Sequence, residues 1–152
     1  MLPSSLSENW KIDHTHRLCE SYLHFFKTPL LSSFNPTFEE LFHSPLILLS
    51  HGTQSDPILN FGNQAALTLW ELSWEELTQM PSRLTAEPME REARAAFMNE
   101  VRTHGFVSHY AGIRVSKSGR RFKIENAKVW NLIDQQNQLT GQAACFSQWS
   151  YL

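Results

Sequence analysis

The sequence predicts an α+β domain with a five-stranded antiparallel sheet and helices grouped on one face, over residues 44–152. An N-terminal helical extension over residues 1–43 precedes it. Three observations lead to this fold class. Two short apolar segments come first, helical periodicity then follows, and a two-residue period fills the C-terminal third. This order of two strands, several helices and a three-strand meander is typical of one antiparallel sheet with its helices on one side.

The N-terminal extension is expected to hold two helices. Over residues 8–28, apolar side chains recur at helical spacing and form one broad stripe: Leu18, Cys19, Tyr22, Leu23, Phe25 and Phe26. Such a stripe must be buried, either against the domain or against a second copy of the chain. A short second helix follows Thr37, because Thr37 and Glu40 fit a capping box.

The middle of the chain predicts two strands and then helices. Residues 46–50 and 58–61 have the length and apolarity of short strands. Asn63 is a natural N-cap for a helix over residues 64–70, and Ser73 begins a second helix that runs to about Met80.

Residues 89–103 give the most regular helical pattern. Four apolar side chains follow one another at i+4 spacing and are expected to face the sheet: Met89, Ala93, Phe97 and Val101. Gly105 is a suitable stop for this helix.

The remaining residues form a meander. Residues 106–116 alternate, Lys117-Ser118-Gly119 predicts a tight hairpin turn, residues 121–133 form a long strand, and a last strand covers 141–149. We expect the two early strands to be central in the sheet, with helix 89–103 packed across it.

Composition bounds the class of protein. The 152 residues, 41% hydrophobic and 18% charged, suit one globular domain. No apolar run approaches the length of a membrane span and no secretory signal opens the chain, so a cytoplasmic protein without membrane contact is expected. The cysteines Cys19 and Cys145 are read as free, buried thiols.

The charge distribution makes nucleic acid an unfavoured partner. The net charge is −2, with ten acidic and three basic residues in 37–100 but two acidic and seven basic residues in 101–152. The basic hairpin around residues 114–128 is read as a solvated sheet edge protected by its charge. The two oppositely charged pieces could also favour head-to-tail association.

Several motifs resemble a known fold. Ile58–Ala66 and Leu69–Leu77 resemble successive segments of PAS domains, although Glu71 stands where glycine is usual, and Gly119–Phe122 resembles the PAS hairpin. A further set of motifs is similar to the MEKHLA family: Asp56–Asn63, Pro81–Glu87, Tyr110–Arg114, Val129–Leu132 and Gly141–Ala144. That family is a PAS-like domain of bacterial stand-alone proteins and of plant homeodomain–leucine zipper regulators. The hexapeptide that names the family is absent. The resemblance implies a PAS-like fold and a regulatory role, and it supplies no ligand or catalytic residue.

Catalysis and metal binding find no support in the motifs. The chain lacks a G-x-S-x-G elbow, a P-loop and an HExxH motif, so we expect no enzyme. The seven histidines show no metal-ligand spacing, and neither metal nor heme is favoured. Residues 80–85 lack the cysteine of flavin photosensors, which excludes a photochemical adduct there, while non-covalent flavin stays open. No cofactor is assigned.

Function is therefore sought in a cleft between helix 89–103 and the sheet. The expected role is a sensory module that binds a small molecule there, self-associates, or signals to a separate protein. The candidate cleft residues are Trp70, Phe97, Ile113, Arg114, Asn126, Trp130 and Ala144. The alternative is an interaction domain with a packed, ligand-free core, which a cavity no larger than a few waters would favour.

Overall fold

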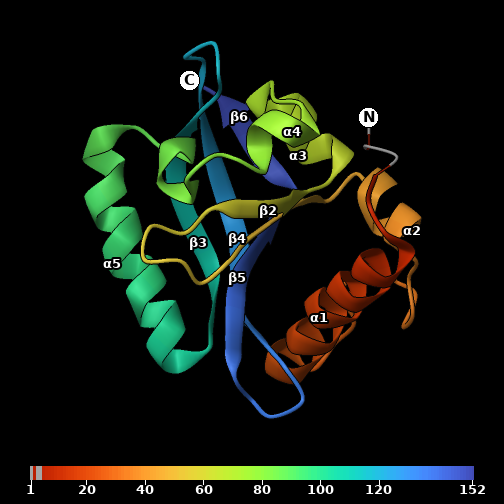
Figure 1. Cartoon of the computed structure of the whole chain (residues 1–152). Coiled ribbons are helices and arrows are strands. Elements are labelled where there is room, and N and C mark those ends of the chain that lie inside the picture. Colours follow the sequence, from red (N-terminus) through yellow and green to blue (C-terminus); the bar gives the residue numbers. More distant parts are fainter. Residues whose placement is uncertain (1, 3–4) are drawn as a thin grey trace.

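A computed structural model describes residue 2 and residues 5–152, including all of their side chains except those of Met89 and Glu90. Twelve helices and strands follow one another in these residues (Figure 1). They are α1 (Glu8–Phe26), α2 (Phe38–His43), β1 (Ile47–His51), β2 (Leu59–Gly62), α3 (Gln64–Trp70), α4 (Trp74–Leu77), a 3₁₀ helix η1 (Ser82–Thr85), α5 (Pro88–His104), β3 (Phe106–Val115), β4 (Arg121–Ile133), β5 (Leu139–Phe146) and β6 (Gln148–Tyr151).

All strands pair antiparallel in the order β2-β1-β5-β4-β3, as the predicted fold class requires. Two details differ from the expectation. Of the two early strands, only β1 is internal, because its second edge pairs with β5. Strand β2 lies at the end of the sheet, and Ile58 just before it forms a bridge with Pro81 after α4. The last predicted strand also breaks at Ser147, so that β6 forms a sixth strand beside the start of β4.

Helices cover both faces of the sheet. Figure 1 shows α5 on one side of the strands and α1 on the other. We call the side of α5 the inner face and the side of α1 the outer face. Leu18 and Tyr22 of α1 are 0% and 4% exposed and belong to the same core as Trp130 of β4. The apolar stripe of α1 is therefore buried against the domain itself, although Leu23 on its margin remains 40% exposed.

The predicted helix starts are confirmed by their caps. Thr37 with Glu40 and Ser73 with Glu76 form complete capping boxes. Asn63 caps α3 by accepting from the Ala66 amide. Its fully buried side chain also accepts from the Leu48 amide and donates to the Leu46 carbonyl, which is 2.6 Å away. Asn63 thus joins the main chain at the start of β1 to the first turn of α3.

Two facing bulges reverse which residues point inward along β3 and β4. The pairing advances from Val107–Val129 to Tyr110–Ala127 and then to Gly112–Ile124, which leaves one extra residue first in β3 and then in β4. His109 and Asn126 lie there with φ of 61° and 52°. Because each bulge shifts the alternation by one residue, even-numbered residues of β4 face inward before Asn126 and odd-numbered residues after it.

Helix α5 also turns a different face inward than its i+4 pattern predicts. Ala93 is exposed and Phe97 is half-buried, stacking on Tyr110 at 3.9 Å between ring centres. The Met89 side chain lies outside the described part. A strict i+4 row drifts about 40° around a helix with each step, so it cannot stay on one face. Val101 is buried, and the inward positions before it are Arg94 and Met98.

Candidate functional site

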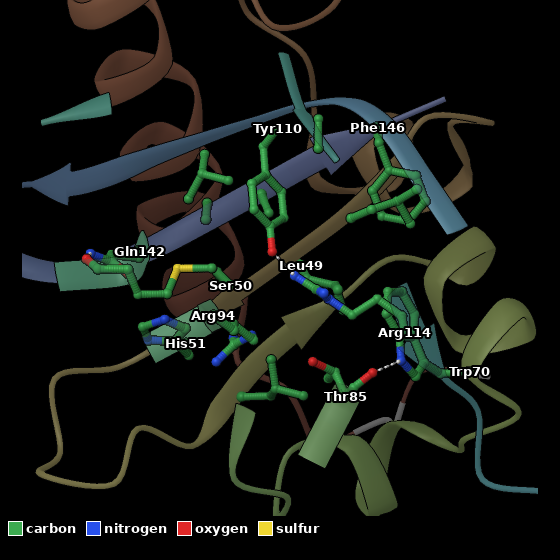
Figure 2. A pocket seen from close by; sticks show the side chains of 17 residues that line it. Leu49, Ser50, His51, Trp70, Thr85, Arg94, Tyr110, Arg114, Gln142 and Phe146 are labelled. Carbon is green, nitrogen blue, oxygen red and sulfur yellow. Dashed lines mark hydrogen bonds between the residues drawn. The ribbon is translucent and has the colours of Figure 1, made fainter. Parts of the chain in front are cut away.

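A cavity lies between α5 and the inner face of the sheet, and we call it the α5 cavity (Figure 2). It encloses about 40 Å³, which is room for about three water molecules. Its lining comes from both early strands, α3, η1, α5 and the meander: Leu49, Ser50, His51, Leu59, Trp70, Thr85, Arg94, Met98, Tyr110, Arg114, Ile124, Ala127, Val129, Gln142, Ala143, Ala144 and Phe146.

Arg114 enters the cavity from β3. Its side chain is only 4% exposed, donates to the Tyr110 hydroxyl at 3.0 Å and donates to the Ile113 carbonyl at 2.9 Å. The guanidinium also lies 5.4 Å from the centre of the Tyr110 ring. Both hydrogen-bond acceptors are neutral, so these contacts orient the guanidinium without neutralising its charge.

Arg94 enters from α5. Burial and the neighbouring Arg114 lower the pKa of its guanidinium to about 10. The group still carries its charge at neutral pH, in a setting where burial and a second cation both disfavour the charged form.

His51 and Gln142 line the end of the cavity near α5. His51 Nδ1 lies 2.8 Å from the Gly52 carbonyl oxygen, and burial lowers the pKa of its imidazole, which favours the neutral form. Gln142 donates to the Met98 carbonyl of α5 at 3.0 Å and to Asn131 at 3.2 Å. Asn131 in turn donates to the Arg102 carbonyl at 3.1 Å. Side chains of β4 and β5 therefore hold α5 by its main-chain carbonyls.

The structure brings some of the seven sequence-predicted cleft residues together and separates others. Trp70, Arg114 and Ala144 line the α5 cavity. Trp70 donates to the Thr85 carbonyl at 3.4 Å and packs on Phe122. Phe97 and Ile113 do not line the cavity. Phe97 stacks on Tyr110, which does, and Ile113 precedes Arg114 in β3 and so points to the opposite face of the sheet.

Asn126 and Trp130 do not lie where simple alternation places them. Asn126 is the exposed bulge residue and donates to Gln148 at 2.6 Å. Trp130 comes after that bulge, so it faces outward and packs on Tyr22 and Phe26 of α1. The bulge is the physical reason for both corrections, because it changes the parity of every later residue of β4.

Four cavity residues carry no signal in the local sequence: His51, Arg94, Met98 and Tyr110. Arg94 reads as one of several charges along a polar helix, and Tyr110 lies where the bulge at His109 resets the alternation. Gln142 was recognisable as a polar side chain among apolar strand neighbours that needs a partner if buried. It finds that partner on α5.

Other possible sites offer less. Within the described ranges, no three His, Cys, Asp or Glu side chains come together as a metal site would require. Burial raises the pKa of Cys19 to about 11 and of Cys145 to about 12, so both thiols are protonated at neutral pH. Of the helices described, none has the length and apolarity that crossing a bilayer demands.

Comparison with known families gives one match over nearly the whole chain. The family model of the MEKHLA domain matches residues 12–151. Homeobox-leucine zipper protein ATHB-9 of Arabidopsis thaliana is 30% identical over 111 residues, which are 72% of this chain and 13% of that protein. Homeobox-leucine zipper protein HOX10 of Oryza sativa subsp. indica is 26% identical over 140 residues, 89% of this chain and 17% of that protein. The chain thus spans less than a fifth of these relatives.

Comparison with solved structures shows the PAS fold. A PAS domain of a protein from Colwellia psychrerythraea superposes with a TM-score of 0.63 at 16% identity, covering 75% of this chain and 92% of that one. A light-oxygen-voltage domain studied with a flavin analogue superposes with a TM-score of 0.57 at 13% identity, covering 70% and 76%. At such identities the likeness concerns the fold alone.

Proposed function

The chain belongs to the MEKHLA domain family, and from this premise we propose that it is a non-catalytic regulatory module that binds a small molecule in the α5 cavity. Ligand binding changes the position of α5 and, through the sheet, the surface offered to a partner. The observation that carries this proposal is the convergence of polar side chains in one mostly apolar cavity: His51, Thr85, Arg94, Tyr110, Arg114 and Gln142.

Helix α5 is suited to move. Val101 is its only described apolar side chain that is fully buried, whereas Ala93 is exposed and Phe97 is half-buried. No described side chain caps its N-terminus, and its best-defined tethers are the hydrogen bonds from Gln142 and Asn131 to its carbonyls. An element with few buried apolar contacts opens at low free energy. A ligand larger than the present cavity would therefore enter by displacing α5 outward.

Strand β1 connects the cavity with the opposite face of the sheet. Leu49 and His51 line the cavity, while the hydroxyl of Ser50 between them meets His14 of α1 at 2.9 Å. A ligand that shifts β1 thus also shifts a contact of α1. This arrangement supports an output at α1 and the segment after it, where Leu23 of α1 is 40% exposed and Phe34, between α1 and α2, is 69% exposed. Self-association or a separate signalling protein would cover these side chains.

An interaction domain that binds no ligand is the second candidate. The observation that favours it is the small size of the cavity, about 40 Å³, since a space for about three waters holds few ligands without rearrangement.

The test compares the chain with a variant whose cavity is filled. Ala144→Val adds two methyl groups on the cavity wall, and Ala95→Val on the exposed face of α5 is the control. A metabolite library is screened by melting temperature, and binding is confirmed by native mass spectrometry. We expect at least one compound to raise the melting temperature of the unaltered chain and of Ala95→Val, and to lose this effect in Ala144→Val. If no compound stabilises any of the three proteins, the interaction domain is the better description.

A further inference from the structure

Two positive charges share the α5 cavity. Figure 2 shows the side chains of Arg94 and Arg114 among those that line it, one from α5 and one from β3. The nearest polar partners of Arg114 are a phenol and a main-chain carbonyl, at 3.0 Å and 2.9 Å. His51 beside them is neutral rather than a third positive charge, because burial lowers the pKa of its imidazole.

No described carboxylate compensates these charges. The ion pairs among described side chains join Lys11, Arg83, Lys117, Arg121 and Lys123 to acids elsewhere, and within the part of the chain that the structure describes no Asp or Glu oxygen lies within 4.0 Å of Arg94 or Arg114. The protein does neutralise cations at its surface, where pairing contributes little. Two buried arginines with no carboxylate partner among the described side chains are unfavourable in an apolar cavity. A bound anion is the direct way to offset that.

We propose that the α5 cavity is a receptor site for a short-chain monocarboxylate, whose carboxylate lies between Arg94 and Arg114 and whose tail contacts Leu49, Met98 and Ala144. This inference rests on the proposed function and names the ligand class. A guanidinium matches a carboxylate with two parallel hydrogen bonds. The Tyr110 hydroxyl completes the polar end of the site.

The size and lining of the cavity favour a carboxylate over a phosphate. The walls away from the arginines are apolar, with Leu49, Leu59, Val129 and Ile124 among them. Such walls accept a hydrocarbon tail and offer a phosphate dianion no further donors to replace its lost water. The small volume selects a short tail.

The first experiment compares matched probes. The melting temperature of the full chain is measured with sodium propionate, sodium butyrate, butyramide and inorganic phosphate at equal ionic strength. Butyrate and butyramide have nearly the same shape and differ in charge. We expect propionate or butyrate to raise the melting temperature in a concentration-dependent way, with butyramide and phosphate leaving it unchanged.

The second experiment uses Arg94→Met and Arg114→Met, with Arg102→Met on the exposed side of α5 as the matched control. Removing a buried charge also removes its desolvation penalty, so Arg94→Met should melt higher than the unaltered chain without ligand, while its affinity for butyrate falls about 10- to 100-fold. Arg102→Met should keep both properties. A purely structural role for Arg94 predicts the reverse: a lower melting temperature without ligand and unchanged butyrate binding.

The remaining outcomes separate failure of the carboxylate inference from failure of the proposed ligand-binding function. Equal stabilisation by butyramide, or stabilisation by phosphate alone, overturns the carboxylate class and leaves ligand binding in the cavity standing. Stabilisation by a neutral metabolite in the library screen, without any by carboxylates, does the same. If carboxylates, butyramide, phosphate and the library all leave the melting temperature unchanged, this inference and the proposed function both fail.

Discussion

The imidazole of His14 on α1 and the hydroxyl of Ser50 on β1 lie 2.9 Å apart and join the outer helix to a strand of the cavity. Ser50 donates its own proton to Asn60 Oδ1 at 2.5 Å, so His14 is the donor in this pair. The ring also stacks on Trp10 at 4.8 Å and lies 5.5 Å from Phe61. This apolar setting determines how α1 responds to pH.

The fold should lose stability as the pH is lowered from 6.5 to about 4, because of His14. Burial, and secondarily Arg17, lowers the pKa of His14 from 6.5 to about 4 in the folded chain. In this window the unfolded chain takes up a proton that the folded chain does not, so acid favours unfolding by up to about 3 kcal/mol. His14→Gln should flatten the dependence measured by urea unfolding at pH 4–7. The exposed His16→Gln is the control, and an equal slope in His14→Gln and the unaltered chain would contradict the assignment.

The packing of α1 on the outer face should contribute strongly to stability. Leu18 is 0% exposed in the common core, so Leu18→Ala should lower the free energy of unfolding by about 2–5 kcal/mol. Leu23 lies five residues later on the same helix and is 40% exposed, so Leu23→Ala should change it by no more than about 0.5 kcal/mol. Chemical denaturation measures both. Similar losses of unfolding free energy in Leu18→Ala and Leu23→Ala would show that α1 is not docked as described. For the same reason as Leu18→Ala, deletion of residues 1–30 should lower the melting temperature.

The side chain of Asn63 should be irreplaceable. It accepts from the amides of Leu48 and Ala66 and donates to the carbonyls of Leu41 and Leu46, all within 3.2 Å. Asn63→Ala leaves several buried main-chain groups unpaired and should cost about 2–4 kcal/mol. Thermal or urea unfolding measures this cost. Asn99→Ala on the exposed side of α5 should be close to neutral. A neutral Asn63→Ala would mean that water replaces the amide there.

Gly141 should tolerate no side chain. A Cβ built at this position would lie 2.2 Å from the carbonyl oxygen of His51, a main-chain atom of the cavity strand β1. Gly141→Ala must push β1 and β5 apart and should lower the free energy of unfolding by about 1–3 kcal/mol. Gly52→Ala is the control, because its Cβ would meet only the flexible side chain of Gln54. Comparable melting temperatures for the two variants would refute the close approach.

The sequence by itself determined what local chemistry controls. The capping boxes at Thr37 and Ser73, the N-cap at Asn63 and the long strand at residues 121–133 follow from side chains that act on their own neighbours in the chain. The order of strands and helices then restricts the sheet to an antiparallel form. For the cavity, the sequence identified Trp70, Arg114 and Ala144 as candidates that do line it.

Only the tertiary structure decided which face each residue of the meander presents. The bulges at His109 and Asn126 turn Trp130 toward α1 and bring Tyr110 beside Arg114, and alternation read along one strand cannot reveal a bulge that depends on the partner strand. The inward position of Arg94 has the same origin. Its helix is polar over most of its surface, so docking on the sheet, rather than helical periodicity, determined that a charged residue faces the cavity.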